Sequence, residues 1–343
     1  MGGAIVRQLL ARGDEVWSFA RGDYPELEDV GVAVLRGDLA RGADVDRCFA
    51  EAAAAGCETV FHVAALAGSW GPESAYRAVN IEGTEHVIAA CRNHGLRRLV
   101  YTSSPSVVLS GRDVEGGDES LPYPAHWLAH YPATKAAAEQ RVLAANDGEL
   151  ATVSLRPHLI WGPGDGHLLP RLVDRSRRGR LRCIGQGDKL IDAVYIDDAA
   201  QAHLLADGRL LGEREGAGRH SAQRPGRDGE LVAGRAFFIT AGDPIETWTM
   251  VNHLLAAAGE PPVTKRISAR AARNAGAVLE AVWRLLRLST EPPMTRWVAE
   301  ELSTSHWFDI SAARRDLGYA PRVSLQDGLA RLRAWCDGGG PKV

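Results

Sequence analysis

Short apolar runs alternate along the chain with longer segments in which apolar residues recur every three or four positions. The runs are rich in Val, Leu and Phe, as in strands buried on both faces of a parallel sheet. They cover residues 15–20, 32–35, 59–64, 98–103, 151–156 and 236–240. The amphipathic segments between them predict helices over 4–11, 44–54, 81–94 and 133–146. This alternation predicts an α/β fold with a doubly wound parallel sheet of the Rossmann type, which binds ligands at the carboxyl ends of its strands.

The beginning of the chain departs from that pattern. A Rossmann unit opens with a strand and a glycine-rich turn, but here Met1-Gly2-Gly3 runs directly into a predicted helix. We expect the sheet to lack its first strand, as if the unit began roughly ten to fifteen residues upstream. An ordinary start before an ordinary helix is the alternative. With the strand absent, cofactor affinity and stability would depend on residues before Met1.

The pattern also predicts the domain organisation. Residues 1–162, with returning segments at 193–208 and 235–241, form a dinucleotide-binding Rossmann domain. Residues 163–192 and 242–337 form a smaller, mainly helical substrate lobe. Residues 211–234 are rich in Gly, Arg and Glu without apolar periodicity, and predict a flexible surface insertion. Residues 269–288 carry too many charges to span a bilayer and predict an amphipathic helix that packs on the core or forms a lid, or alternatively touches a lipid surface.

Composition narrows the class of protein. The 343 residues are 45% hydrophobic and 24% charged with a net charge of −3, which is ordinary for a soluble globular protein. The five cysteines are scattered without a Cys-x-x-Cys pair and predict reduced thiols in a cytoplasmic protein. No basic stripe indicates nucleic acid, no secretory signal is evident, and we assign no metal site. Peripheral contact with a membrane or a multienzyme partner stays open.

Candidate chemistry lies at Tyr131 and Lys135, four residues apart on a predicted helix and so on one face. A lysine cation beside a phenol favours the phenolate, so we expect the tyrosine pKa to fall towards neutrality. Ser104, at the end of the apolar run 98–103, can bind the same substrate oxygen. This trio of side chains is typical of hydride transfer at a carbonyl carbon, although Tyr-x-x-x-Lys alone is a weak signal.

Other motifs follow in a consistent order. They are Gly2-Gly3, Gly37-Asp38-Leu39, His62-Val63-Ala64-Ala65, Val79-Asn80-Ile81-Glu82-Gly83-Thr84, Tyr101-Thr102-Ser103-Ser104, Leu155-Arg156-Pro157, Gly162-Pro163-Gly164-Asp165, Val194-Tyr195-Ile196-Asp197-Asp198 and 309–319. In combination, they make the chain resemble an extended short-chain dehydrogenase/reductase of the NAD-dependent epimerase/dehydratase group. The resemblance implies that Ser104, Tyr131 and Lys135 are catalytic. It also implies cofactor contacts from Gly2, Asp38, Leu39, Ala64, Ala65, Asn80, Thr102, Ser103, Tyr131, Lys135, Pro157 and Ile160.

The end of the second strand bears on the choice of nicotinamide. In this fold an acidic residue there binds the ribose hydroxyls of NAD, whereas a nearby arginine accommodates the 2′-phosphate of NADP. The chain has Ala20 where the carboxylate would stand, followed by Arg21. We therefore expect NADP(H) with Arg21 as a contact; Asp23 binding the ribose is the alternative.

The C-terminal part favours an apolar substrate. Residues 237–245 resemble the 3β-hydroxysteroid dehydrogenase branch, and 292–296 and 305–309 resemble bacterial reductases of head-to-head olefin biosynthesis. The resemblance implies NADPH-dependent reduction of the 3-keto group of a long-chain 2-alkyl-3-oxoalkanoate, with His158, Arg296 or His306 as candidates to meet its carboxylate. Alternatives are 3β-hydroxysteroid dehydrogenase activity, UDP-sugar epimerisation and a non-catalytic NADP-binding sensor. The resemblance also implies a homodimer formed through the Tyr131 helix.

Overall fold

The computed structural model describes residues 1–218 and 231–340 and confirms the predicted fold class. Four parallel strands form the central sheet in the order β11-β6-β4-β3. Their bounds are β3 Thr59–His62, β4 Arg98–Thr102, β6 Ala151–Pro157 and β11 Arg235–Ile239. Every residue of β4 and β6 is buried, as continuous apolar runs predict for central strands covered on both faces.

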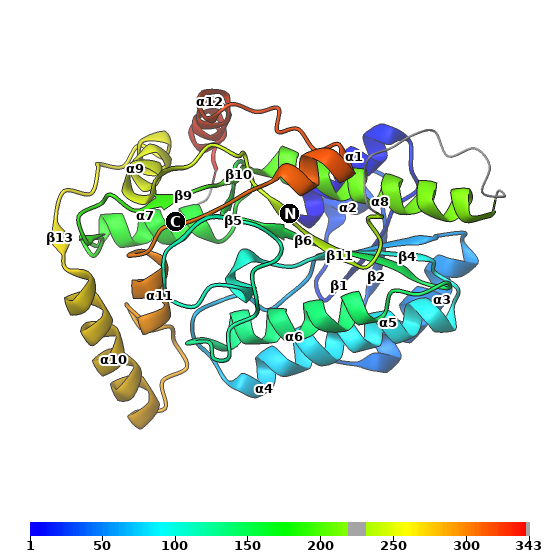
Figure 1. The fold of residues 1–343 in the computed structure, drawn as a ribbon, viewed down its shortest axis with the longest axis horizontal. Helices are drawn as coiled ribbons and strands as arrows, with labels where there is room; N and C mark the ends of the chain where they lie inside the picture. Colours follow the sequence, from blue (N-terminus) through cyan, green and yellow to red (C-terminus); the bar gives the residue numbers. More distant parts are fainter. Residues whose placement is uncertain (219–230, 341–343) are drawn as a thin grey trace.

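Helices cover both faces of this sheet (Figure 1). One face is covered by α3 Gly42–Ala54, α5 Gly83–Asn93 and α6 His130–Ala144. The other is covered by α1 Gly2–Arg12 and α8 Ile196–Gly218. Short helices α2 Pro25–Glu28 and α4 Glu73–Tyr76 and the turns η1 Arg77–Glu82 and η2 Pro105–Val107 complete this part of the chain.

The first two strands stand apart from the central sheet. β1 Trp17–Ala20 and β2 Ala33–Arg36 pair with each other in parallel, and in the described residues no strand joins β1 to β3. This interruption between β1 and β3 agrees with the expectation of a sheet that lacks its first strand. A cavity of about 1690 Å³ is lined by α1, β1 and β3, and it leaves Phe19 and Phe61 only half-buried.

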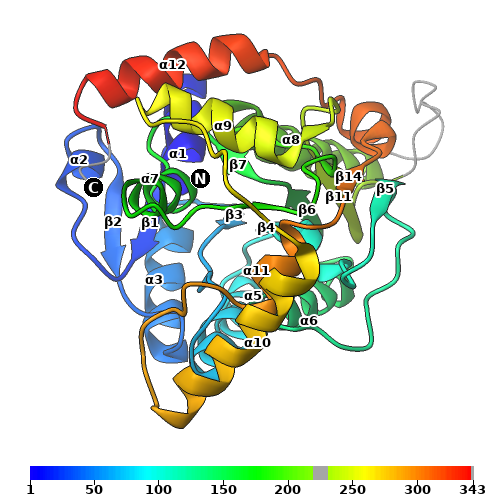
Figure 2. The same ribbon diagram turned by 90° about the vertical axis from the view of Figure 1, so that its left-hand side faces the viewer.

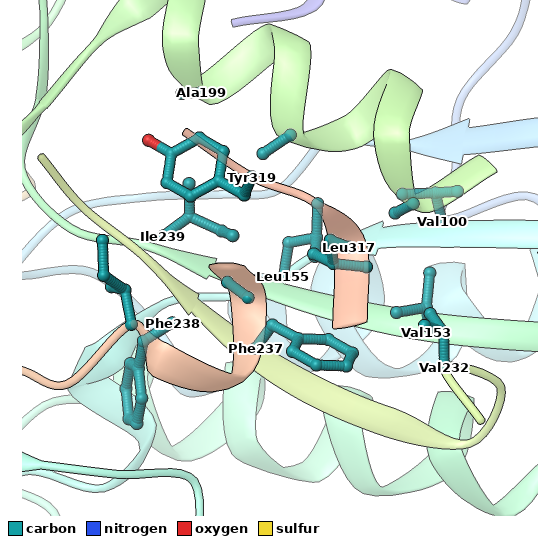
Figure 3. Packing of buried hydrophobic residues seen from close by; sticks show 14 of the residues in the cluster. Val100, Val153, Leu155, Ala199, Val232, Phe237, Phe238, Ile239, Leu317 and Tyr319 are labelled. Atoms are coloured by element: carbon teal, nitrogen blue, oxygen red, sulfur yellow. The ribbon is translucent and has the colours of Figure 1, made fainter. Parts of the chain in front are cut away.

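A buried cluster ties the C-terminal segment to the central sheet (Figure 3). Phe237 and Ile239 of β11 are fully buried with Leu317 of η3 Ala313–Leu317. Phe238 stacks on Phe308 with ring centroids 4.1 Å apart. The Tyr319 hydroxyl donates to the carbonyl of Thr240 at 3.0 Å, so this polar group is satisfied inside the core. The cluster fixes the path of the chain after the substrate lobe.

Short strands accompany the predicted helices of the C-terminal lobe, and some of them come from earlier in the chain. A second sheet has the order β12-β9-β14-β5, with β5 Val114–Gly117, β9 Leu190–Ile191, β12 Ile245–Glu246 and β14 His306–Phe308. Two further pairs join β7 Ile160–Trp161 to β10 Val194–Tyr195 and β8 Cys183–Ile184 to β13 Arg266–Ile267. The helices are α7 Leu168–Arg177, α9 Thr247–Ala257, α10 Ala269–Leu285, α11 Arg296–Glu301 and α12 Leu325–Asp337.

Two segments differ from their sequence expectations. Helix α8 continues to Gly218, inside the segment 211–234, and the Glu213 carboxylate accepts hydrogen bonds from the amides of Val232 and Ala233 at 2.6 and 3.2 Å. Residues 219–230 of the expected insertion lie outside the described residues. Helix α10 buries Ala272, Gly276 and Glu280, whereas Val278 and Leu285 are exposed, so the expected core-facing orientation is wrong for these aliphatic residues. Among the described helices, none is both long enough and apolar enough to span a bilayer.

Candidate active site

Helix α6 positions the tyrosine and the lysine. It begins at His130 after Ala129, so Tyr131 lies in its first turn and Lys135 one turn later. Glu139 follows after another turn on the same face, where it is completely buried against β6. Tyr131, Lys135 and Ser104 line the same cavity, at the carboxyl edge of the central sheet. The structure thus brings together the three residues that the motif spacing predicts.

Ser104 follows β4 in an extended conformation and precedes η2. Its hydroxyl lies 2.9 Å from the hydroxyl of Ser106 and accepts from the Ser106 amide at 3.3 Å, and it lowers the pKa of the Tyr131 phenol. Ser106 is buried, so these contacts hold the Ser104 side chain in place. A substrate oxygen placed beside Tyr131 would therefore also meet this hydroxyl.

Lys135 is almost fully buried and is fixed by two contacts. Its ammonium donates to the carbonyl of Thr102 at 2.6 Å and lies 4.1 Å from the centroid of the Tyr101 ring. Burial lowers the pKa of Lys135 to about 7, and the negative charge of Glu139 opposes that shift. The protonated form of Lys135 is therefore stabilised by the carboxylate of Glu139, one turn further along α6.

Tyr131 differs from expectation in its acidity. Burial raises its pKa, and the nearby Tyr76 and Glu301 raise it further, whereas the hydrogen bond to Ser104 lowers it. The expected fall towards neutrality is therefore wrong for the protein by itself, because burial outweighs the other influences on the phenol. The raised pKa keeps Tyr131 protonated near pH 7, the form that a proton donor needs.

Glu139 is held by a buried network that the sequence patterns did not indicate. Its carboxylate accepts from Arg156 Nη2 at 2.7 Å, from the Tyr123 hydroxyl at 2.7 Å and from the Ser154 hydroxyl at 2.8 Å. The Arg156 side chain is only 4% exposed, so the pair is shielded from water. These bonds keep the pKa of Glu139 lowered despite its burial.

Most predicted cofactor contacts line the same cavity as the catalytic trio. These residues are Gly2, Leu39, Ala64, Ala65, Thr102, Ser103, Pro157 and Ile160. Helix α1 begins at Gly2 without an acidic residue in its first turn, which suits a helix N-terminus that faces a phosphate. After β2, Gly37 allows close packing, because a Cβ there would clash with the Phe19 ring. The cavity thus extends from a helix N-terminus to the Ser–Tyr–Lys group.

Three predicted contacts lie outside the cavity lining. Arg21 is exposed just after β1. Asp38 accepts from the amide of Ala40 at 3.0 Å, a local turn bond. Asn80 is buried, where its side chain bonds both the amide and the carbonyl of Leu66, at 2.7 and 3.0 Å, and donates to Thr134 on α6 at 3.0 Å. Asn80 therefore ties the loop after β3 to the helix that carries Tyr131.

Arg36 was missed by sequence reasoning. In the parallel pairing of β1 with β2, Arg36 stands opposite Ala20, at the strand end where the ribose-binding residue is expected. Its guanidinium forms an ion pair with Asp23, so Asp23 is engaged, and both side chains are largely exposed. An arginine directly after a predicted strand was the available signal, since neighbouring parallel strands end at one edge.

The three candidates for binding a carboxylate are engaged with other protein groups. His158 Nδ1 lies 2.6 Å from Asp192, and its Nε2 lies 3.1 Å from His306 Nδ1. His306 Nε2 donates to the carbonyl of Glu301 at 2.8 Å, which leaves its Nδ1 as the acceptor from His158. Burial lowers the pKa of His306 to about 4, and the nearby His158 lowers it further, in keeping with a neutral ring. Arg296 is paired with Glu280 at 2.8 Å.

Helix α11 brings the substrate lobe to the catalytic trio. The ring of Trp297 lies 6.2 Å from that of Tyr131, centroid to centroid. Glu301 is on the same helix, and burial raises the pKa of its carboxyl to about 7 although the nearby His158 and Trp297 lower it. No sequence motif predicted that these two residues lie near Tyr131, because that proximity depends on how the lobe folds back.

A Ser–Tyr–Lys group beside a long cavity at the carboxyl edge of a parallel sheet defines an oxidoreductase of the extended short-chain dehydrogenase/reductase class, which acts on CH–OH and C=O groups. Its cofactor class is a nicotinamide dinucleotide. Residues 1–267 match the 3-beta hydroxysteroid dehydrogenase/isomerase family, and the chain belongs to this family.

Known proteins of similar sequence include reductases. The chain is 50% identical over 336 residues to a 2-alkyl-3-oxoalkanoate reductase of Stenotrophomonas maltophilia, covering 97% of this chain and 96% of that protein. A protein of the same name from Shewanella oneidensis is 44% identical over 341 residues, covering 97% and 83%. A solved structure of MoeE5 in complex with UDP-glucuronic acid and NAD has a TM-score of 0.68 at 25% identity, covering 98% and 96%.

Proposed function

We propose that this chain uses NADPH to reduce the 3-keto group of a bulky apolar substrate, a 2-alkyl-3-oxoalkanoate, to the 3-hydroxy acid. The observation that carries the proposal is its near-full-length similarity to two reductases named for that substrate. The convergence of Ser104, Tyr131 and Lys135 on one cavity supports the chemistry. A place in olefin biosynthesis is part of the same proposal.

Each side chain has a role that its contacts support. Bound NADPH supplies a hydride to the ketone carbon. Tyr131 donates its proton to the ketone oxygen, while the Ser104 hydroxyl donates a hydrogen bond to the developing alkoxide. Lys135 presents its ammonium to the cofactor ribose from a position fixed by Thr102 and Tyr101. Trp297 supplies apolar surface beside Tyr131 for the substrate.

The cavity fits a dinucleotide along its length. We assign the pyrophosphate to the N-terminus of α1 at Gly2, and the nicotinamide to the end near Pro157 and Ile160. The loop residues Ala64 and Ala65, with Thr102 and Ser103, line the path between these ends, and Leu39 meets the adenine end. Asn80 has a positioning role. Its hydrogen bonds to Leu66 and Thr134 hold the loop after β3 and helix α6 in place.

Two arginines favour NADP(H) over NAD(H). Arg21 and Arg36 both lie at the ends of β1 and β2, and the carboxylate of Asp23 is paired with Arg36. A guanidinium binds a phosphate with two parallel hydrogen bonds. Replacing Arg21 or Arg36 by alanine should raise the Kd for NADPH about tenfold, the equivalent of one lost charge-assisted contact.

Fluorescence titration with NADPH and NADH checks that expectation. NADH serves as the internal control, because it has no 2′-phosphate and its Kd should not change in either variant. An equal loss of affinity for both cofactors would contradict the assignment, as would unchanged NADPH binding.

The substrate assignment is tested by following NADPH oxidation with a panel of ketones. We expect turnover with long-chain 2-alkyl-3-oxoalkanoates. With a 3-ketosteroid we expect kcat/KM to be at least about tenfold lower, because a poorer fit to an apolar pocket lowers kcat/KM by about that factor. Preference for the steroid would transfer the proposal to 3β-hydroxysteroid dehydrogenase activity. Tight NADP binding without turnover of any ketone would favour the sensor.

The epimerase alternative has less support from the site. The position just before the 194–198 motif at which sugar-nucleotide epimerases commonly carry an arginine is occupied by Ile191, which is buried in β9. Lys189, the nearest cation in sequence, donates to Asp113 at 2.6 Å. Conversion of UDP-glucose without net NADPH consumption would favour this alternative. The homodimer through α6 stays a prediction, which sedimentation velocity can test.

A further inference from the structure

Helix α10 carries an apolar stripe that faces away from the protein. Its buried residues are Ala272, Gly276 and Glu280, spaced one turn apart. The stripe lies on another side of the helix, and its residues recur every three or four positions: Ala271, Ala275, Val278, Val282 and Leu285. Val278 and Leu285 are 64% and 83% exposed, and the adjoining Leu286 is 60% exposed. Exposed aliphatic groups gathered in one place mark an interaction surface.

Charge around the stripe has one sign. Every exposed charged side chain between residues 264 and 290 is cationic: Lys265, Arg266, Arg270, Arg273, Arg284 and Arg287. The single acid in this range, Glu280, is buried and paired with Arg296 and Arg284. An apolar stripe on a helix whose exposed charged side chains are all cationic is complementary to a surface that is apolar inside and anionic outside.

The region around α10 is convex, so its shape suits a flat binding surface. Helix α10 lies at the periphery of the molecule, at the end opposite α12, with α11 beside it (Figures 1 and 2). It is a convex ridge about 25 Å long, from its 17 residues and the rise of an α-helix. Such a helix inserts its apolar side shallowly between lipid headgroups while its arginines meet lipid phosphates.

We propose that α10 docks this protein on the surface of an anionic lipid bilayer. Val278, Val282, Leu285 and Leu286 enter the headgroup region, and Arg270 and Arg287 contact lipid phosphates. This inference goes beyond the proposed reaction, and it concerns binding alone, so it stands or fails independently of substrate turnover.

The contacts of α10 connect the docking surface to the active site. Gly276 allows α10 to approach the backbone closely, because a Cβ there would lie 2.7 Å from the amide nitrogen of Arg296. Glu280 accepts from that same amide at 2.7 Å and from the Arg296 guanidinium at 2.9 Å. Trp297, the next residue, is the one that faces Tyr131. Docking through α10 therefore connects the bilayer, through existing contacts, to the helix that carries Trp297.

Co-sedimentation with phosphatidylglycerol vesicles tests the proposal, with phosphatidylcholine vesicles as the neutral comparison. We expect the chain to bind the anionic vesicles at low salt and to be released at high salt, because screening weakens exposed charges. The double variant Val278→Ser/Leu285→Ser should bind at least about tenfold more weakly, since it removes much of the inserted aliphatic surface. The double variant Arg270→Gln/Arg287→Gln should bind the anionic vesicles at least about fivefold more weakly. Each arginine near a charged surface contributes about such a factor to the affinity.

Matched controls lie far from α10. Val30 is 55% exposed, so Val30→Ser removes a comparable aliphatic group elsewhere. Arg333→Gln removes an exposed charge on α12, at the opposite end of the molecule (Figure 2). Both controls should bind vesicles as the unmodified chain does. Absence of vesicle binding, equal binding to phosphatidylcholine, or equal losses in the control variants would overturn the proposal. So would a dimer in sedimentation velocity that the Val278/Leu285 variant dissociates, because the stripe would then join two copies of the chain.

Discussion

Replacing Tyr131 by phenylalanine should lower kcat for ketone reduction at least about a hundredfold, the usual contribution of a positioned general acid. The change removes the proton donor and leaves the ring against Trp297, 6.2 Å away between centroids. Substrate and cofactor should therefore still bind, and KM and the Kd for NADPH should change little. Steady-state NADPH oxidation together with a fluorescence titration measures both quantities on the same preparation.

Tyr319→Phe is the matched control for this experiment. It also removes a buried tyrosine hydroxyl, the one that donates to Thr240 at 3.0 Å, but away from the catalytic cavity. We expect it to cost about 1 kcal/mol of stability, a typical net hydrogen bond, with kcat unchanged. If Tyr131→Phe retained nearly full activity, the assignment of the general acid would be wrong. Equal losses in both variants would indicate a folding defect instead.

Glu139→Gln should have the largest effect on stability, about 3–5 kcal/mol, because it leaves the guanidinium of Arg156 buried without its counter-charge. Both partners lie inside the protein, where the Glu139 side chain is 0% and that of Arg156 4% exposed. Urea unfolding measures the change. Glu85→Gln is the matched control. Glu85 pairs at the surface with Arg141, which lies on the same helix as Glu139, and such exposed pairs contribute at most about 1 kcal/mol.

The same substitution should also change the pH dependence of activity. Lys135 acts as a cation, so reduction should weaken as pH rises through its pKa, which burial lowers to about 7. Glu139 raises that pKa, and its removal should shift the alkaline limb of kcat/KM to lower pH. If Glu139 had only a structural role, its removal would not change the pH at which kcat/KM falls. Loss of stability without this shift would show that Glu139 stabilises the buried Arg156 but does not influence Lys135.

Much of the fold could be predicted from local patterns. The apolar runs correspond to β1, β2, β3, β4, β6 and β11, with ends that differ by one or two residues. A strand buried on both faces must be apolar throughout, so its signal is contained in a few consecutive residues. The spacing of Tyr131 and Lys135 was equally readable, because four residues on a helix share one face whatever surrounds them.

The rest depended on which groups the fold brings together. Sequence spacing did not indicate that Arg36 stands beside Ala20, that Trp297 faces Tyr131, or that Arg156 completes the environment of Lys135. These contacts join residues from different elements, and no local periodicity encodes them. The pKa of Tyr131 was mispredicted for the same reason, because the burial that raises it depends on how different elements pack around the phenol.

The sequence by itself determined that this protein is a Rossmann-type α/β oxidoreductase with Ser104, Tyr131 and Lys135 as its candidate catalytic residues, because motifs and periodicities are local. It also determined that residues 269–288 form an amphipathic helix. Only the tertiary structure decided that this helix turns its small residues inward and its aliphatic residues outward. Periodicity defines which side chains share a face, whereas the fit of Gly276 against Arg296 selects which face is covered.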